Sequence, residues 1–235
     1  MLMDGCHAIV RAACLGLCAL AVPAWAQTLP ASAADAATKC PDAVREGERL
    51  RKAPRTASAT VTRPALRQNL LLMARQDQEA RAHLLANGGR IDPRRPEFAH
   101  LAEVDAANLK RWKHIVAQDG FPTAQMVGFD GVDAALLLTT HATKDPDFQE
   151  QILKLVVALG EARGDQVATL TDDVLNGRGK KQRYGTNYEI RNGQWYPAPI
   201  EDEGNVDARR REVGLLTLAN DVCLVRALHA VPASP

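Results

Sequence analysis

Apolar residues recur every three or four positions along most of this chain, the spacing that places them on one face of an α-helix. The clearest run starts at Pro64 and stops at the Asn-Gly-Gly sequence that begins at Asn87. Proline is favoured in the first turn of a helix and glycine just beyond its end, so a helix over 64–86 is expected. Its apolar stripe contains one acidic residue, Asp77, one turn before Arg81. The two residues are candidates for a functional site or for a structural ion pair.

The same periodicity predicts several further helices. In one of them, Val104 and Leu109 flank Asp105 like a hydrophobic staple around an aspartate cap, so the helix is expected to restart at Asp105. Asp145 followed by Pro146 marks the start of another helix, since aspartate caps helices and proline is favoured at the first position. The expected helices cover 98–119, 130–141, 145–163, 165–177 (capped by Asp165) and 206–228.

The spacing changes from helical to alternating at Tyr188. An Asn-Gly pair at Asn192 divides the stretch from Tyr188 to Tyr196, and this pair is the strongest short-range signal of a β-hairpin. Pro197 and Pro199 end the second strand, because proline cannot donate to the ladder. The predicted fold is therefore mainly α, with five or six helices and one appended β-hairpin in a single globular domain.

The N-terminal residues have the layout of a secretory signal peptide. A short apolar run follows Arg11 and ends in the Ala-Trp-Ala site that closes at Ala26. We expect cleavage after Ala26 and a periplasmic or secreted mature protein with no membrane span. The expected organisation is a signal peptide over 1–26, a flexible tether over 27–63 with a helical piece around 42–51, a helical domain over 64–229, and a tail over 230–235.

Signal cleavage would leave two of the five cysteines, Cys40 and Cys223. An even pair in an oxidising compartment suggests a disulfide between the N-terminal segment and the last helix. Closing so long a loop stabilises by roughly 4 kcal/mol in the chain-entropy model. The alternative is two independent thiols.

Charge and motif content exclude several functions. The formal net charge is +1, and the signal segment carries one Asp and one Arg, so the mature chain has no electrostatic footprint for nucleic acid. Phosphate-binding loops, dinucleotide fingerprints and the Gly-x-Ser-x-Gly elbow are missing from the sequence, and so are the His-x-x-x-His and Cys-x-x-Cys spacings of zinc sites. We therefore expect no cofactor and no metal, and a small molecule or a cell-envelope partner as the ligand.

The stretch from Leu136 to Gln149 is the densest group of potentially reactive side chains beside an apolar segment. His141 is a candidate general acid or base, because histidine has the side chain whose unperturbed pKa lies nearest neutrality. The alternative is a histidine that ends a helix, where the helix dipole favours its protonated form. Asp145 is a candidate catalytic carboxylate or a helix cap, and Gln149 is a candidate ligand-binding group or a partner of that cap.

Two further groups of polar residues lie in the C-terminal part of the chain. Tyr184 and Thr186 flank Gly185, which permits a close approach of the backbone, so they line a pocket or form a tight entry into the hairpin. Arg209 and Arg210 are expected in the first turn of the last helix, where the helix dipole disfavours cations. At least one of these arginines should therefore have an acidic partner or an anionic ligand.

Two functions are compatible with these residues. The first is a hydrolase-type enzyme in which the polar residues converge on one cleft around His141, which acts as the acid or base. The second is a non-catalytic periplasmic binding or interaction module, in which the same charges form a structural ion-pair network. The catalytic candidates are His141, Asp77 and Asp145, and the binding candidates are Arg81, Gln149, Tyr184, Thr186, Arg209 and Arg210.

Short motifs follow one another in a characteristic order along the predicted domain. They are Asp77-Gln78 with Arg81, Asp105 with Asn108, Gly120-Phe121-Pro122, Val127-Gly128, His141-Ala142, Asp145, Phe148-Gln149, Gln182 with Tyr184-Gly185-Thr186, and Val206-Asp207 with Arg209-Arg210. In order and spacing they resemble an uncharacterised bacterial family, the domain of unknown function numbered 6624. The resemblance extends from Leu66 to Leu224 and implies no established activity.

Three positions depart from the pattern of that family. Phe121 stands where tryptophan is usual, and Asn187 stands where glutamine is usual. Asp173 stands where arginine is usual, which removes a positive charge. This chain therefore lacks the positive charge that the resemblance implies at this position.

Overall fold

The computed structural model describes Ala36 and residues 38–50, 60–86 and 94–228. The predicted signal peptide and the predicted tail lie outside the described residues. The described part contains eight α-helices and one antiparallel hairpin, so the mainly α class is confirmed, while the expected number of helices is too low. No described helix has the length and apolarity needed to span a membrane.

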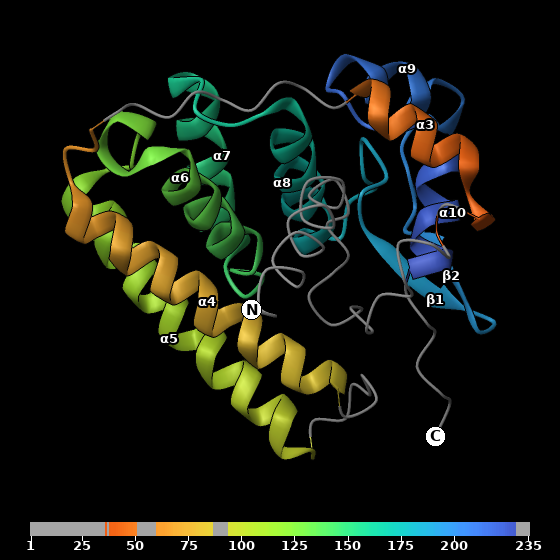
Figure 1. The fold of residues 1–235 in the computed structure, drawn as a ribbon. Helices are drawn as coiled ribbons and strands as arrows, with labels where there is room; N and C mark the ends of the chain where they lie inside the picture. The colour runs from red at the N-terminus through yellow and green to blue at the C-terminus, as the bar shows by residue number, and fades with distance from the viewer. Residues whose placement is uncertain (1–35, 37, 51–59, 87–93, 229–235) are drawn as a thin grey trace, which may run out of the picture.

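Long helices make up the first half of the domain (Figure 1). The helix α4 (Pro64–Ala86) packs against α5 (Pro96–Asp119) and α6 (Ala124–Thr140), and these three form one layer. The helices α7 (Pro146–Leu159) and α8 (Gly164–Gly177) form the next pair, and α8 also contacts α6. The α4 bounds coincide with the expected helix over 64–86, because its proline start and glycine stop are strong local signals.

The main core is centred on Trp112 of α5, whose side chain is fully buried. The rings of Phe121 and Phe148 meet its indole edge-on, with centroids 6.0 and 6.4 Å away. The indole Nε1 donates a hydrogen bond of 2.9 Å to Thr139 Oγ1 on α6. One aromatic cluster thus fixes α6 and α7 against α5, in a chain with only 4% aromatic residues.

A kink at Gly128 divides α6. Its φ of 74° and ψ of 165° lie in a region that only glycine adopts readily. Beside the kink, Arg67 Nε and Nη2 donate to both carboxylate oxygens of Asp130. The regular part of α6 after Gly128 corresponds to the expected helix over 130–141.

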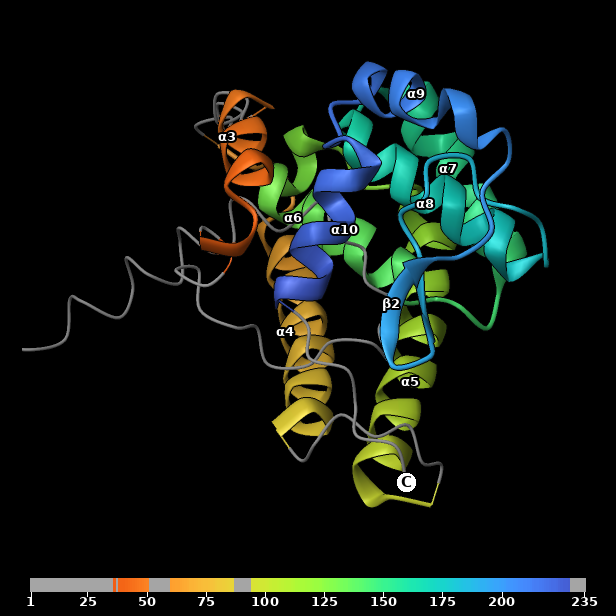
Figure 2. The same cartoon turned by 90° about the vertical axis from the view of Figure 1, so that its right-hand side faces the viewer.

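The hairpin forms where the alternating pattern predicts it. Strand β1 (Tyr188–Arg191) pairs with β2 (Gln194–Pro197), and the turn residues Asn192 and Gly193 both have positive φ, as an Asn-Gly turn requires. Figure 2 shows β2 beside α10 (Leu218–Leu228). Buried Tyr188 and Trp195 pack with Val225 of α10 in a separate small core.

The expectation of one last helix over 206–228 is wrong, because two helices occupy this range. The helix α9 (Val206–Glu212) follows a 3-10 turn, η1 (Glu203–Asn205), and ends before Gly214, which has a φ of 77°. Asp207 Oδ1 accepts from the backbone N–H of Leu218 at the start of α10, at 2.6 Å. The apolar spacing continues across this break, which is why the pattern reads as one helix.

An additional helix, α3 (Pro41–Leu50), lies within the predicted tether, at the position of the expected helical piece. It packs against α10, and the disulfide between Cys40 and Cys223 joins the two segments as expected. Glu46 of α3 accepts from the backbone N–H and the hydroxyl of Thr217, just before α10. This part of the tether is therefore docked on the domain.

Two expected helix caps are wrong. The helix α5 continues through Asp105, whose carboxylate instead accepts a hydrogen bond from Arg81. The N-cap of α8 is Arg163 rather than Asp165, and Gln166 Oε1 accepts from the backbone N–H of Arg163 at 2.9 Å. In both places the carboxylate that the pattern assigned to a helix end accepts from an arginine, Arg81 for Asp105 and Arg163 for Asp165. A charged donor binds a carboxylate more strongly than a backbone amide does.

Candidate functional site

His141 and Asp77 meet between α6 and α4. The imidazole Nδ1 of His141 lies 2.7 Å from Asp77 Oδ2, and the two side chains are 6% and 1% exposed. His141 caps the end of α6, while Asp77 lies on the buried stripe of α4. Burial raises the pKa of Asp77, but the hydrogen bond and charge of His141, together with the charge of Arg81, outweigh it and lower that pKa. Asp77 is therefore an ionised carboxylate at neutral pH.

This contact determines which nitrogen of His141 carries the proton. An ionised carboxylate only accepts hydrogen bonds, so the neutral imidazole must hold its proton on Nδ1. Its Nε2 then has a free lone pair, and no residue in the described part of the chain hydrogen-bonds to it. His141 is thus oriented by Asp77 and able to take up a proton at Nε2.

Arg81 bridges two carboxylates at the same place. Its Nη1 lies 2.9 Å from Asp105 Oδ1 and 3.3 Å from Asp77 Oδ1. Asp105, on α5, is 27% exposed and is the most accessible of these residues. Burial raises the pKa of Asp105, although the neighbouring Arg81 guanidinium acts in the opposite direction. Gln78 Nε2 also donates to Asp77 Oδ2, at 2.8 Å.

The cluster of Asp77, Arg81, Asp105 and His141, called the α4–α6 cluster below, leaves some hydrogen-bonding groups unused. Arg81 Nε and Nη2 are buried and have no hydrogen-bond partner, and neither does Asp77 Oδ1 apart from its 3.3 Å ion-pair contact. A buried polar atom left without a partner costs about 1–3 kcal/mol. Such uncompensated groups are typical of sites that meet a ligand or water.

Gln149 secures the end of the helix that carries His141. Its side chain is buried, and Nε2 donates to the carbonyl oxygens of Thr139 and Thr140, at 3.0 and 3.1 Å. These carbonyls belong to the last turn of α6, where backbone acceptors lack partners within the helix. The predicted role of Gln149 in binding a ligand remains a prediction, but its amide donors are already used.

Asp145 lies in the turn between α6 and α7. Its Oδ1 accepts from the backbone N–H of Phe148 at 3.0 Å, and its Oδ2 pairs with Lys113 at 2.7 Å. The Lys113 hydrogen bond, followed by that from the Phe148 backbone, lowers the pKa of Asp145. Asp145 therefore caps α7 and ties this turn to α5, and its catalytic role remains a prediction.

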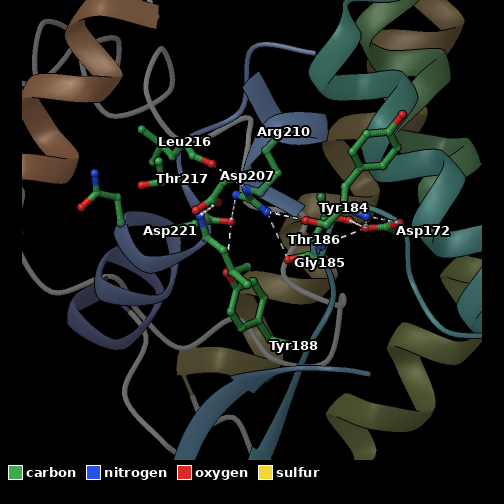
Figure 3. Close-up of polar contacts among 12 residues, drawn as sticks. Asp172, Tyr184, Gly185, Thr186, Tyr188, Asp207, Arg210, Leu216, Thr217 and Asp221 are labelled. Carbon is green, nitrogen blue, oxygen red and sulfur yellow. Dashed lines mark hydrogen bonds and ion pairs between the residues drawn. The ribbon is translucent and has the colours of Figure 1, made fainter. Parts of the chain in front are cut away.

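A second buried network surrounds Arg210 (Figure 3). Its Nη2 pairs with Asp221 at 2.5 Å, its Nη1 donates to the Tyr184 carbonyl at 2.7 Å, and its Nε donates to the Leu216 carbonyl at 2.5 Å. Tyr188 donates its hydroxyl to the same Asp221 oxygen at 3.0 Å. Burial raises the pKa of Asp221 in spite of Arg210, and it also raises the pKa of Tyr188. Of the two expected alternatives, an acidic partner or an anionic ligand for at least one of the two arginines, the structure shows an acidic partner at Arg210.

Three backbone N–H groups of the loop before the hairpin bond to one carboxylate. Asp172 of α8 accepts from the backbone N–H groups of Arg183, Tyr184 and Thr186, at 2.7, 3.0 and 2.9 Å. The hydroxyl of Thr186 donates to it as well, at 2.9 Å. The Tyr184 ring points away from Arg210 in Figure 3. These contacts match a tight entry into the hairpin, and a pocket-lining role for Tyr184 and Thr186 remains a prediction.

Arg209 also bonds within the protein. Its Nε donates to the Arg183 carbonyl at 2.9 Å and its Nη2 to the Glu201 carbonyl at 2.7 Å. The expectation that Arg209 and Arg210 start a long helix is wrong, because α9 has only seven residues and they lie in its last turn. The helix dipole favours cations there, so their position needs no external anion.

The structure does not bring all the predicted site residues together. His141, Asp77 and Arg81 belong to the α4–α6 cluster, while Gln149 holds the last turn of α6 and Asp145 caps α7. Arg210, Tyr184 and Thr186 belong to the Arg210 and Asp172 networks, and Arg209 bonds to the nearby Arg183 and Glu201 carbonyls. No hydrogen bond or ion pair within the described ranges joins the α4–α6 cluster to these C-terminal residues. No group of three or more His, Cys, Asp and Glu side chains in the described residues could hold a metal ion. The pattern missed the pairing of Asp105 with Arg81, because Asp105 looked like a helix cap.

Asp173 and Asn187, two of the residues that depart from the family pattern, are neighbours in the structure. Burial raises the pKa of Asp173 to about 7, against a smaller lowering by the neighbouring Asn187 amide. Asp173 Oδ2 and Asn187 Nδ2 are shielded from solvent without good hydrogen bonds. The negative charge of the adjacent Asp172 carboxylate raises the pKa of Asp173 further.

The fold and the α4–α6 cluster define a mainly α domain with an appended hairpin and a buried Asp-His-Arg group. The model of a family described as "Family of unknown function (DUF6624)" matches residues 64–231. The chain belongs to this family, which confirms the resemblance seen in its motifs. Neither the curated proteins nor the solved structures include a match.

Proposed function

We propose that this domain is a hydrolase-type enzyme in which His141 acts as general base and then as general acid. The observation that supports this most strongly is the 2.7 Å contact between His141 Nδ1 and Asp77 Oδ2, with no described partner at Nε2. A carboxylate that holds one ring nitrogen fixes the tautomer and orientation of the imidazole, and it stabilises the imidazolium that forms during catalysis. The other nitrogen is then placed for proton transfer.

Water is the nucleophile in this proposal. No serine, threonine or cysteine side chain in the described part of the chain hydrogen-bonds the His141 ring, and the nearby Thr139 hydroxyl already donates to the Ala135 carbonyl. His141 Nε2 would remove a proton from water as the water oxygen attacks the substrate carbonyl or phosphorus. The same proton would then pass from Nε2 to the leaving group as its bond breaks.

The alternative is a non-catalytic binding or interaction module. It is favoured by the low exposure of His141, 8% for the whole residue, and by the structural contacts of Gln149, Arg209 and Arg210. In that case the α4–α6 cluster is a structural ion-pair network that holds three helices together. The two functions differ in whether His141 is needed for turnover or only for stability.

A substrate screen on the mature protein tests the proposal. Chromogenic esters, amides and phosphoesters would be assayed with wild type, His141→Gln and Asp77→Asn. His114→Gln is the matched control, because His114 is an exposed histidine on α5. The proposal predicts turnover that falls by about 10²- to 10⁴-fold in the first two variants and is unchanged in the control. Turnover that is equal in folded His141→Gln and wild type would contradict the role of His141, and no turnover of any substrate by wild type would support the binding module.

We also propose that the protein is exported. The Cys40–Cys223 disulfide supports this location, because such bonds persist in oxidising compartments. Export is tested by N-terminal sequencing of protein recovered from the periplasm or medium of a bacterial expression host. The proposal predicts a mature chain that starts at Gln27, and recovery of an uncleaved chain from the cytoplasm alone would contradict it.

A further inference from the structure

Two arginines of α4 differ in whether the Nε–Nη2 edge of the guanidinium makes hydrogen bonds. The Nε and Nη2 atoms of Arg67 donate to the carboxylate of Asp130, with Nε at 3.0 and 3.1 Å from its two oxygens. The corresponding Nε and Nη2 atoms of Arg81 have no hydrogen-bond partner. Arg67 lies at the surface, whereas the Arg81 side chain is only 1% exposed.

The contacts that Arg81 does make do not involve this buried edge. Both of its ion pairs, with Asp77 and Asp105, involve Nη1 alone. The Nε–Nη2 edge has two parallel N–H donors at the spacing of two oxygens of a carboxylate or phosphate group. A buried guanidinium edge without acceptors costs free energy. An acceptor that reaches this edge would therefore bind favourably.

We propose that the Nε–Nη2 edge of Arg81 binds an oxyanion of the substrate, a carboxylate or a phosphate group, in a bidentate contact. This inference rests on the proposed function, because it makes the α4–α6 cluster the place where substrate binds. Arg81 supplies the binding contact, and His141, held by the same Asp77, supplies the proton transfer. Asp105 is the competing anion, and its 27% exposure places it on the accessible side of the cluster.

An incoming oxyanion competes with the carboxylates of Asp77 and Asp105 for the positive charge of Arg81. Asp77 and Asp105 offset the single charge of Arg81, so an arriving oxyanion meets a site that is not strongly positive. Binding should therefore depend on the geometry of the fork more than on net charge. Removing the charge of Asp105 should therefore strengthen oxyanion binding. Replacing Arg81 by lysine keeps the charge but removes the paired N–H donors, so it should weaken oxyanion binding.

The direct test follows the side-chain Nε–H signal of Arg81 by NMR while acetate, inorganic phosphate or neutral acetamide is titrated into the mature protein. The signal is assigned by its loss in Arg81→Lys. Saturable movement with acetate or phosphate, and none with acetamide, is the expected result. The two oxyanions distinguish a carboxylate site from a phosphate site. Movement that is equal for acetamide and acetate, or no movement up to the highest soluble concentration, would overturn the inference.

Variants make the test independent of catalysis. Arg81→Lys should weaken oxyanion binding by about tenfold or more, since a charge-assisted hydrogen bond is lost, while Arg67→Lys should leave it unchanged. Asp105→Asn should tighten it, and this variant keeps Arg81 in place if Arg81→Lys does not fold. His141→Gln should still bind the oxyanion. Binding without turnover in wild type would remove the proposed enzyme but keep the Arg81 site, whereas turnover without oxyanion binding would remove only the Arg81 site.

Discussion

The imidazole of His141 and the carboxylate of Asp77 lie 2.7 Å apart, although 64 positions separate them in the chain. The contact joins the end of α6 to the middle of α4 in a place where both side chains are nearly sealed from solvent. A carboxylate in such a place is stable only when it is paired, so the two residues depend on each other. This dependence can be measured through stability and through the protonation of the histidine ring.

Replacing Asp77 with asparagine should destabilise the fold by about 3–5 kcal/mol at neutral pH, because it breaks a buried pair and leaves Arg81 and His141 with a weaker acceptor. The folded-state pKa of Asp77 is lowered, so the stability that it contributes is present above its unfolded pKa of 3.8 and is lost as pH falls through the folded value. The variant should therefore approach wild type in strong acid. Urea unfolding at neutral and acid pH measures this difference.

Asp130→Asn is the matched control for this variant. The Asp130–Arg67 pair is exposed, with side chains 47% and 40% accessible, and exposed pairs contribute about 0–1 kcal/mol. Equal losses of unfolding free energy in Asp77→Asn and Asp130→Asn would mean that the α4–α6 cluster is not a coupled buried group.

The kink at Gly128 should resist substitution by alanine. An added Cβ would lie 2.8 Å from Asp130 Oδ1, and the backbone φ of 74° already disfavours any side chain. Gly120 has a φ of 72°, and a Cβ added there would meet nothing within 4 Å, so Gly120→Ala reports the backbone strain alone. We expect about 1–3 kcal/mol for Gly120→Ala, and a larger loss for Gly128→Ala because Asp130 must move. Thermal unfolding of both variants measures this, and equal losses would show that Asp130 moves freely.

Local signals in the sequence were sufficient for most of the secondary structure. Pro64 and the glycines after Asn87 marked both ends of α4, and the Asn-Gly pair at Asn192 located the hairpin. These signals act through the backbone of a few neighbouring residues, so they do not depend on the rest of the fold. The break between α9 and α10 was hidden, because the apolar spacing continues across it. The contacts that hold it, such as that of Arg210 with the Leu216 carbonyl, involve polar groups that this spacing does not report.

The site was only partly predictable for the same reason. Asp77 and Arg81 were recognisable, since they interrupt an apolar stripe at helical spacing. The convergence of His141 with this pair was only one of two alternatives, and the pairing of Asp105 with Arg81 was not predicted, because these contacts span separations of 64 and 24 residues. At least one of Arg209 and Arg210 was expected to have an acidic partner or an anionic ligand, from a place in the first turn of a helix that the structure does not bear out. The pairing of Arg210 with Asp221 required the three-dimensional arrangement of α9 and α10.

Asp173 should make stability depend on pH near neutrality. Its folded-state pKa is raised from 3.8 to about 7 by burial, so the folded protein holds a proton that the unfolded chain releases. Wild-type stability should then fall as pH rises from about 4 to 7, and the loss should persist above that range. Asp173→Asn should remove this fall and raise stability at pH above 7 by about 2–4 kcal/mol. Unfolding curves of both proteins across pH check this, and parallel curves would contradict it.

The Cys40–Cys223 disulfide closes a loop with a sequence separation of 183. The double variant Cys40→Ala with Cys223→Ala should lose about 4–5 kcal/mol of unfolding free energy in the chain-entropy model. Reductant should lower wild-type stability towards that of the variant and leave the variant unchanged. Denaturant unfolding with and without reductant measures both effects. A reductant effect of equal size in the two proteins would show that it does not act through this bond.

The most direct test of the central claim is the protonation state of the His141 ring, read from its ¹⁵N NMR shifts in wild type and in Asp77→Asn. The account predicts that neutral His141 carries its proton on Nδ1, facing Asp77, and has an unprotonated Nε2 that is free to act as a base. It also predicts that this preference weakens in Asp77→Asn. A neutral wild-type ring with its proton on Nε2 would contradict the account, because Nε2 could then not accept a proton from water.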